Sequence, residues 1–510
     1  MKRDGYNNSL WQDTNKEENV FTKTLSDNSN FDVVIAGGGI TGISTGLQLQ
    51  KQGKKVLIAE AQNIGFGTTG GTTAHLNNFL DTSYDVIEKK FSEEDAITIA
   101  RATEQALSLI KNNIDTYQID CGYKRLPGYV FSEDEEQSKT LESMAEGVKR
   151  CGLACSWTDS IPVPITFERS LRIDNQASFH PTRYLQALGK AFLEAGGTIL
   201  ENCRVNAVEE GDEFHTIKTS AGDFSAQHFI YATHIPPGVN LLHFRCAPYR
   251  SYAMAIKLNK KEDYPDALVY DMQDPYHYYR TQEVDGELYL IAGGEDHKTG
   301  HEENTDQCFR KLEAYLHKYF DIKEISHRWS SQYFEPTDGL AYIGHLPGHS
   351  NNMYVATGFG GNGMIYGTIA ANLLTDIICG NDNPLIDILD PNRIKMVAGF
   401  NNFIKEAADV AGHLVNKILV PAEKLKGLAS LAPGQAAIVK YDGQKMAIYK
   451  DDNGEIFALH AACTHIKCDV SWNSSERTWD CPCHGSRFSY TGEMLTAPAR
   501  KDLQPVDITS

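Results

Sequence analysis

Two short segments near the C-terminus place cysteine and histidine at close spacing. One reads Cys-Thr-His-Ile-Lys-Cys and the other Cys-Pro-Cys-His-Gly-Ser. Their candidate metal ligands are Cys463, His465, Cys481 and His484. Two thiolates and two imidazoles are what a [2Fe–2S] centre needs when cysteines hold one iron and histidines hold the other. The residues therefore predict a site that carries single electrons.

Zinc is the alternative occupant, because cysteine and histidine at short spacing also bind zinc tetrahedrally. Zinc sites more usually show Cys-x2-Cys or His-x3-His pairs, however, and they leave the extra cysteines Cys468 and Cys483 unexplained. Both segments resemble the cluster-binding loops of the Rieske family. The resemblance implies that the two cysteine ligands hold the inner iron and the two histidines hold the outer iron. It also implies a Cys468–Cys483 disulfide that ties the loops together.

Ser486 and Phe488 bear on the reduction potential of such a cluster. By the resemblance, the Ser486 hydroxyl donates a hydrogen bond to a cluster sulfur and stabilises the reduced state. High-potential members of the family carry tyrosine at the position of Phe488. Because that donor is missing, we expect a potential below the top of the class range, which extends from about −150 to +300 mV.

A β-α-β unit typical of dinucleotide binding stands near the other end of the chain. An apolar strand pattern over 32–36 runs into a glycine-rich turn, a helical stretch follows, and a second strand over 55–59 ends in Glu60. The fingerprint glycines are Gly37, Gly39 and Gly42. They allow a tight turn, close approach of the backbone to a pyrophosphate, and close helix–strand packing. Glu60 is placed to accept hydrogen bonds from a ribose.

A second glycine run has a different meaning. Gly358, Gly360 and Gly363 follow a strand pattern over 353–357 and open a helix. No strand and no acid follow that helix at the distance that a second dinucleotide unit requires. We interpret the run as a loop and helix N-terminus that approach a flavin ring from the far side of the fold.

Several separated pieces of the chain resemble the D-amino-acid-oxidase-like flavoproteins, which include glycine oxidase and sarcosine oxidase. The pieces are the Gly- and Thr-rich run 65–73, the stretch 179–186, the strands around 204–205 and 229–233, and the loop 336–344. The resemblance implies FAD as cofactor and an amino acid or secondary amine as substrate. It also implies cofactor contacts from Gly67, Thr68, Thr69 and Val205.

We therefore expect an α/β, Rossmann-like FAD-binding domain with an interleaved α+β substrate domain, followed by an all-β Rieske domain. A polar extension would occupy residues 1–29 and the oxidoreductase residues 30–380. Segments of about 30–90, 165–240 and 330–380 would bind FAD, and about 91–164 and 241–329 would form the substrate domain. A helical linker over 381–424, with helical periodicity at 400–418, would precede the Rieske domain at 425–510.

The substrate domain contains three alternating runs typical of antiparallel strands, 266–270, 276–280 and 287–291. Arg280 lies on the second run, at a position similar to the carboxylate-binding arginine of glycine oxidase, and its fork geometry suits a carboxylate. A surface arginine is the alternative. Tyr278 has the parity to share a pocket with Arg280, whereas Tyr279 has not. His75 follows the Thr-rich run, in a region where some relatives attach FAD covalently.

The composition limits the partners and the location. A formal net charge of −19 repels nucleic acid and anionic membrane surfaces, so we expect neither as a partner. No secretory signal or membrane span is visible, and the cytoplasm is the expected location. Most of the 11 cysteines are far apart in sequence and are expected to be reduced thiols. A Cys468–Cys483 disulfide would be an exception in that compartment.

The two cofactors together favour one function. A flavin takes two electrons from a substrate and can release them singly, so a tethered one-electron cluster is a suitable next carrier. We expect a dehydrogenase that oxidises an amino acid or secondary amine by hydride transfer to FAD and passes electrons through the cluster to an unidentified external acceptor. An NAD(P)H-dependent reductase that feeds a separate oxygenase, and a redox-responsive protein without turnover, are the alternatives.

Overall fold

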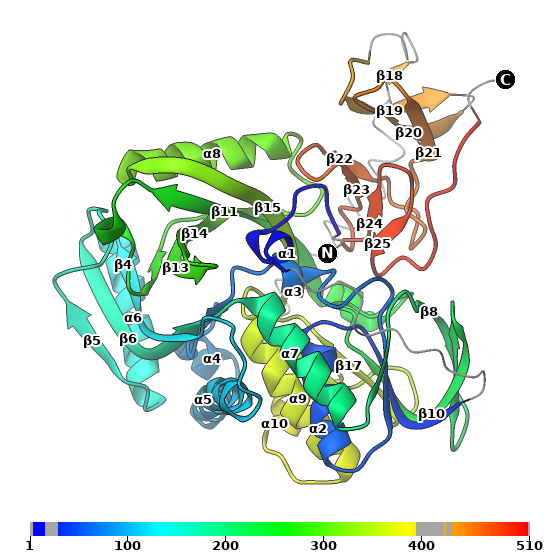
Figure 1. The fold of residues 1–510 in the computed structure, drawn as a ribbon, viewed down its shortest axis with the longest axis horizontal. Coiled ribbons are helices and arrows are strands. Elements are labelled where there is room, and N and C mark those ends of the chain that lie inside the picture. Colours follow the sequence, from blue (N-terminus) through cyan, green and yellow to red (C-terminus); the bar gives the residue numbers. More distant parts are fainter. Residues whose placement is uncertain (1–3, 16–28, 394–422, 425–430, 442, 508–510) are drawn as a thin grey trace.

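The computed structural model describes residues 4–15, 29–393, 423–424, 431–441 and 443–507 (Figure 1). The helical periodicity at 400–418 lies outside these residues. The described part of the predicted linker contains one short helix, α10 (Leu385–Leu389). Among the described helices, none is both long and apolar enough to cross a membrane.

The first sheet contains the predicted β-α-β unit and has the strand order β16-β17-β10-β1-β2-β7; β9 also pairs with β10, and β8 pairs with β9. Its strands are β1 (Asn30–Ala36), β2 (Val56–Ala59), β7 (Thr198–Leu200), β8 (Val205–Glu209), β9 (His215–Thr219), β10 (Gly222–Tyr231), β16 (Tyr342–His345) and β17 (Met353–Thr357). Strand β1 pairs in parallel with both β2 and β10. Its apolar run is buried, as expected for a central parallel strand covered by helices.

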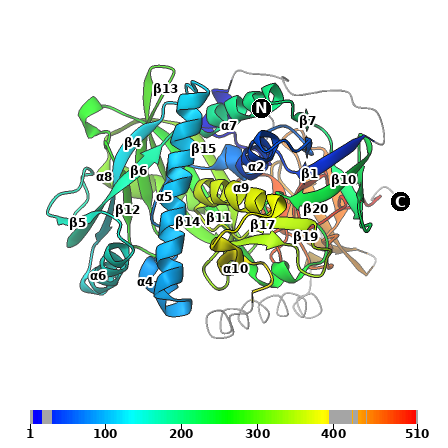
Figure 2. The same ribbon diagram turned by 90° about the horizontal axis from the view of Figure 1, so that it is seen from below.

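Three helices pack together beside this sheet (Figures 1 and 2). They are α2 (Ile40–Lys51), α7 (Pro181–Glu194) and α9 (Gly363–Cys379). Helix α2 begins directly after the first glycine turn, and α9 begins at the end of the second. Both helix N-termini therefore face the same region, where their free N–H groups favour anions.

The second sheet has nine strands and forms the region predicted to be the substrate domain. They are β3 (His75–Leu76), β4 (Lys124–Ser132), β5 (Cys155–Thr158), β6 (Arg169–Ser178), β11 (Cys246–Leu258), β12 (Leu268–Asp271), β13 (Tyr278–Val284), β14 (Glu287–Lys298) and β15 (Ile322–Pro336). The three predicted alternating runs correspond to β12, β13 and β14, which pair antiparallel in that order. Strand β6 pairs with β4 here, although it lies inside the 165–240 segment assigned to FAD binding.

Helices cover the outer faces of the substrate domain. They are α4 (Tyr84–Lys90), α5 (Glu93–Thr116), α6 (Glu135–Arg150) and α8 (Thr305–Tyr319). Phe309, Leu312 and Leu316 of α8 pack in one core with Tyr252 of β11 and Tyr279 of β13. Helix α5 runs past α9 and joins the two domains (Figure 2). The faces of β11 and β13 opposite to α8 are left for the cavity described below.

The C-terminal domain is all-β, as predicted, and contains two four-stranded sheets. The first has β18 (Glu423–Lys424), β19 (Ala436–Tyr441), β20 (Gln444–Lys450) and β21 (Ile456–His460). The second has β22 (Ser471–Asn473), β23 (Thr478–Asp480), β24 (Arg487–Ser489) and β25 (Met494–Thr496). Trp479 and Phe488 are fully buried in the core of this domain.

The polar composition of residues 1–29 gave no indication of what its described part does. Helix α1 (Leu10–Asp13) is buried among the FAD-binding domain, the substrate sheet and the C-terminal domain (Figure 1). Trp11 donates its indole N–H to the carbonyl of Thr72 at 2.6 Å. Asp4 forms an ion pair with the fully buried Arg487 at 2.8 Å. This segment therefore joins three parts of the molecule.

Candidate active site and metal centre

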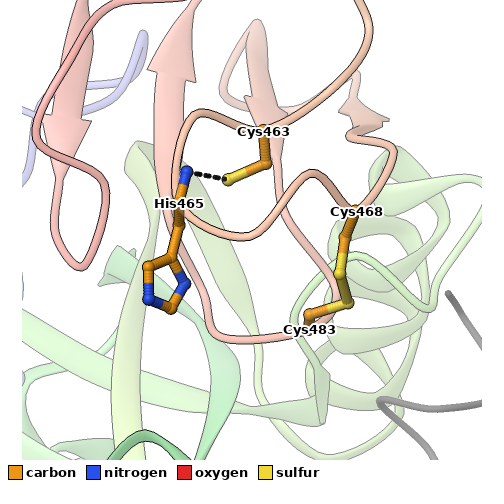
Figure 3. Close-up of a disulfide and its surroundings, with 4 residues drawn as sticks. All are labelled: Cys463, His465, Cys468 and Cys483. Carbon is orange, nitrogen blue, oxygen red and sulfur yellow. Dashed lines mark hydrogen bonds between the residues drawn. A yellow bond between two sulfur atoms is a disulfide. The ribbon is translucent and has the colours of Figure 1, made fainter. Parts of the chain in front are cut away.

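The two cysteine–histidine loops lie side by side at one end of the C-terminal domain. Each loop is closed by its own backbone: the Cys463 N–H donates to the Cys468 carbonyl, and the Cys481 N–H donates to the Ser486 carbonyl, both at 2.8 Å. A Cys468–Cys483 disulfide joins the two loops (Figure 3). The predicted disulfide is confirmed, and it leaves Cys463 and Cys481 as the free thiols of the site.

The four candidate ligands converge. The imidazole rings of His465 and His484 are 5.0 Å apart, and none of their buried ring nitrogens has a hydrogen-bond partner among the described residues. Burial lowers the pKa of His465 to about 4 and that of His484 to about 3, so both rings are neutral, as metal ligation requires. A hydrogen bond with Cys481 is the main cause that lowers the pKa of Cys463. This donor set fits a [2Fe–2S] cluster with two thiolates and two imidazoles.

Ser486 lies close to the candidate ligand Cys463, and Phe488 belongs to the same hydrophobic core as Cys463 and Cys481. The Ser486 Oγ accepts the Ala499 N–H at 3.0 Å, which leaves its own proton free to point at a sulfur. The same hydroxyl contributes to the lowered pKa of Cys463. Phe488 is fully buried and brings no hydrogen-bond donor.

The histidine side of the site is packed against the flavoprotein part of the chain. The ring of His243 lies 4.9 Å from that of His465 and 5.9 Å from that of His484, and Phe244 lies 5.4 Å from His484. His243 accepts the Asn240 N–H at Nδ1, so Nε2 carries the proton that it donates to the Pro236 carbonyl at 2.9 Å. The cluster ligands thus contact the flavoprotein part of the same chain.

Buried charges hold the two parts together. Asp480 of the C-terminal domain lies 3.5 Å from Arg250 of β11 and 3.3 Å from Arg487. Burial acts to raise the pKa of Asp480, but the two arginines outweigh it and the pKa is lowered. Glu476 accepts hydrogen bonds at 2.7 and 2.8 Å from the backbone N–H and hydroxyl of Ser330 on β15. Removing one partner of such a buried ion pair typically costs about 3–5 kcal/mol.

A cavity of about 480 Å³ extends between the two sheets and the C-terminal domain. Nine of the eleven predicted cofactor residues line it: Gly37, Gly39, Glu60, Gly67, Thr68, Thr69, Val205, Gly360 and Gly363. Met494, Thr496 and Arg500 of the C-terminal domain also line it. The volume is in the range of cofactor and ligand sites.

The remaining two predicted residues, Gly42 and Gly358, act through packing. A Cβ on Gly42 would lie 1.9 Å from the Gly37 carbonyl oxygen, so only glycine allows α2 this close to the turn. Gly37 itself has φ +113°, and a Cβ there would meet the Ala232 carbonyl at 2.4 Å. Gly358 has φ +71° and lies against Cys246 and Tyr342. These contacts fix the turn that leads into each helix.

Glu60 stands where the second strand ends. Its carboxylate accepts the Gly38 N–H at 2.6 Å and the Gln62 N–H at 2.8 Å. Burial raises its pKa despite these two donors. The carboxylate is thereby held at the cavity wall, where it can accept a ribose hydroxyl.

Arg280 is not part of the cavity wall, and this corrects its predicted role as a carboxylate anchor. The side chain is fully buried. It donates to the carbonyl oxygens of Thr73 and Phe179 at 2.6 and 3.2 Å and to Gln282 Oε1 at 2.6 Å. The N–H groups of its guanidinium are therefore used by carbonyl groups of the protein, including the Thr73 carbonyl in the loop that borders the cavity. The alternation of side chains along β13 does place Arg280 on the same face as Tyr278. Alternation does not, however, predict how far a side chain extends beyond that face.

Tyr278 and His75 do line the cavity. The Tyr278 hydroxyl lies 3.1 Å from the Ser251 hydroxyl, and its ring lies 5.2 Å from that of His75. Burial and the nearby Arg280 keep the pKa of His75 well below its usual value. Tyr279 points the other way and is buried in the α8 core.

Sequence reasoning missed Asp296, Tyr276 and Tyr333, which line the same end of the cavity. Tyr333 donates to Asp296 Oδ2 at 2.9 Å. Asp296 stands in the charged run Glu-Asp-His-Lys at the end of β14, which by composition is typical of a solvated strand end. No local signal distinguishes it from its neighbours.

Comparisons with known proteins agree with this geometry. Residues 32–377 match the family described as FAD dependent oxidoreductase, and residues 424–507 match the Rieske [2Fe-2S] domain. A Bacillus subtilis (strain 168) protein, the Rieske 2Fe-2S iron-sulfur protein YhfW, is 32% identical over 487 residues, with 95% of each chain covered. Gamma-glutamylputrescine oxidoreductase of Escherichia coli (strain K12) is 26% identical over 384 residues, covering 70% of this chain and 86% of that protein.

Solved structures share the fold of the flavoprotein part. Glycine oxidase from Geobacillus kaustophilus superposes with a TM-score of 0.60 at 17% identity, over 72% of this chain and 100% of that one. L-proline dehydrogenase from P. horikoshii also gives a TM-score of 0.60, at 19% identity over 72% and 98% of the two chains.

Proposed function

Since the chain belongs to the FAD dependent oxidoreductase family and ends in a Rieske [2Fe-2S] domain, we propose that it is a dehydrogenase with an internal electron relay. It oxidises an amino acid or amine by hydride transfer to FAD, and the electrons leave singly through the cluster to an external acceptor. The observation that carries the proposal is the contact between the cluster ligands and the flavoprotein part. His465 and His484 pack on His243 and Phe244, and the C-terminal domain contributes Arg500 to the cofactor cavity.

The residues of the chain have distinct tasks in this reaction. Bound FAD would supply the two-electron acceptor, and the cluster would carry single electrons. The glycine turns and the N-termini of α2 and α9 bind the cofactor and orient it. The sheet face that carries Tyr278 closes the substrate side and excludes water. The buried pairs of Asp480 and Glu476 keep the cluster loops against the cavity.

The electrons leave beside His465. A hollow there is lined by Lys467, Arg500 and Lys501, all exposed, together with Val239, which is 73% exposed. The three cations therefore surround one candidate ligand on a chain whose net charge is −19. This charge distribution favours an anionic or acidic acceptor. We also place the protein in the cytoplasm, because seven of its cysteines neither form a disulfide nor belong to the cluster site.

The reductase alternative receives no specific support. The helix after the second glycine run, α9, is followed by α10 and then by residues outside the described part. The run itself lines the FAD cavity, where it serves the same cofactor as the first run.

Anaerobic mixing tests the proposal. Holoenzyme is mixed with amines, amino acids, N-methyl amino acids or NAD(P)H, and flavin bleaching and the electron paramagnetic resonance signal of the reduced cluster are followed. We expect amine or amino-acid substrates to bleach the flavin first and to produce the cluster signal second. The same experiment with Cys481→Ser should retain bleaching and lose the signal. Rapid reduction by NAD(P)H alone, with none by any amine or amino acid, would refute the proposal.

A further inference from the structure

The substrate end of the cavity has a wall built from four strands. Ser251 of β11, Tyr278 of β13, Asp296 of β14 and Tyr333 of β15 line it. Asp296 Oδ2 accepts the Tyr333 hydroxyl at 2.9 Å. Its Oδ1 is buried and has no hydrogen-bond partner among the described residues. An unsatisfied buried acceptor is costly, so a donor from a ligand is the group that this oxygen lacks.

The charges along the cavity differ between its two ends. No lysine is found among the described residues that line it, and its arginines are Arg204 and Arg500. Arg204 lies near Glu60 and donates to the Met494 carbonyl at 3.2 Å, and Arg500 donates to the Pro237 carbonyl at 3.0 Å. Both therefore belong to the end formed with the C-terminal domain.

The substrate end instead carries carboxylates. Asp81 and Asp296 line it, and each acts to raise the pKa of neighbouring tyrosines. The two histidines of the lining are neutral, because burial lowers the pKa of His75 and that of His234, the latter to about 4. A substrate carboxylate would meet no cation on this wall, whereas an ammonium group would meet an acceptor.

The groups that face Asp296 come from several elements. Tyr276 faces it from the segment before β13, Tyr278 from the start of β13, Tyr333 from β15 and Asp81 from the loop before α4. His277 also acts on it; although burial opposes this, Asp271 and Glu295 raise the pKa of His277 to about 9. Burial raises the pKa of Asp296 to about 7, against the opposing effect of the Ser251 and Tyr333 hydroxyls. The carboxylate therefore ionises fully only when a cation or a higher pH stabilises it.

We infer that Asp296 selects the substrate by holding its ammonium group, and that the preferred substrates are amines with no α-carboxylate. This inference rests on the proposed function and narrows it. The Oδ1 atom accepts an N–H of the ammonium group, and Tyr333 keeps the carboxylate oriented through Oδ2. This proton passes to the carboxylate before hydride transfer, because only the neutral amine has the lone pair that forms the iminium product. Charge-assisted hydrogen bonds of this kind are about twice as strong as neutral ones.

A pair of unreactive probes tests the inference on the holoenzyme. The tert-butylammonium and pivalate ions have the same hydrocarbon shape and opposite charge, and neither carries a hydrogen on the carbon next to the charged group. Binding is measured by titration of the flavin absorbance spectrum and by calorimetry in two buffers. We expect tert-butylammonium to bind at least about tenfold more tightly than pivalate. Below pH 7 its binding should release protons, because the cation lowers the pKa of Asp296.

Three variants sharpen the test. Asp296→Asn keeps the shape and should weaken tert-butylammonium binding at least about tenfold, with the proton release lost. Asp296→Glu should recover part of both. Asp266→Asn, at an exposed site just before β12 that does not line the cavity, should change neither.

The outcomes separate this inference from the proposed function. Preference for pivalate, or unchanged binding and proton release in Asp296→Asn, would overturn the inference. If the Asn variant failed to fold, the comparison of the two probes on the wild-type protein would still decide. If α-amino acids reduced the flavin and no simple amine did, the inference would be contradicted and the dehydrogenase proposal would stand. If neither class of compound reduced the flavin, the dehydrogenase proposal itself would be refuted.

Discussion

The cluster site and the substrate wall are built in opposite ways. The cluster ligands come from two short loops, each closed by its own backbone hydrogen bonds and joined by one disulfide. The substrate wall takes Ser251, Tyr278, Asp296 and Tyr333 from four strands of one sheet. The functional residues of a local loop are close together in the sequence, so they form a motif that can be recognised from the sequence alone. The residues of a sheet wall form no such motif, because strand register decides which side chains meet.

The largest expected effect is at the local site. Cys481→Ser removes one thiolate, and we expect loss of the cluster, since its remaining ligands cannot complete the inner iron. Iron analysis and the electron paramagnetic resonance spectrum of the reduced protein measure this. Cys203→Ser, at another buried free cysteine, is the matched control and should keep both. A native spectrum in Cys481→Ser would contradict the ligand assignment. The cluster site could then no longer be described as two local loops that supply all the ligands.

The glycine turns extend the comparison to the cofactor. Gly42→Ala forces a Cβ against the Gly37 carbonyl, and we expect a destabilisation of about 3 kcal/mol, the upper part of the overpacking range. Gly363→Ala meets no atom within 4 Å and should leave the apoprotein unfolding midpoint unchanged while it weakens FAD binding. Denaturant unfolding of both apoproteins and FAD titration separate the two effects. If both variants lost the same amount of stability, Gly363 would be packed against other residues and would not face the open cavity.

The same contrast explains what could be predicted from the sequence. The cluster loops and the β-α-β unit are contiguous, and their glycines, cysteines and histidines have steric or ligand demands that few other residues meet. Arg280 was placed on the correct face of its strand, but its side chain reaches past the cavity to Thr73. Asp296 and the burial of α1 depend on partners far away in sequence, so no local pattern announces them.

A pH profile probes the substrate wall. Below a pH of about 7, protonation of Asp296 removes the charge that holds an ammonium group, so kcat/KM for an amine should fall as pH falls through that value. Tyr333→Phe removes a donor that stabilises the ionised form and should move this midpoint upward. Tyr117→Phe, near the end of α5, is the control. If the midpoint were the same in Tyr333→Phe as in the wild-type protein, Asp296 would not be the group whose protonation causes the fall in kcat/KM at low pH.

The smallest expected effect concerns the electron exit. Lys501→Glu should slow the reduction of ferricyanide a few-fold at low salt and speed that of a cationic cobalt complex, because a charge near His465 steers the acceptor. Both effects should disappear at high ionic strength, and Lys261→Glu, a distant exposed site, should show neither. If both acceptors were reduced by Lys501→Glu at the wild-type rates, the exit would lie elsewhere.

The buried helix α1 has a consequence for biosynthesis. Asp4 pairs with Arg487, and the Tyr6 N–H donates to the Glu476 carbonyl at 3.1 Å, so an early segment binds residues that are made up to 483 positions later in the chain. At translation rates of about 5–20 residues per second, the early segment exists for on the order of tens of seconds before the residues that it binds have been made. Final closure of the molecule therefore completes only after the segment that receives the iron–sulfur cluster has been made.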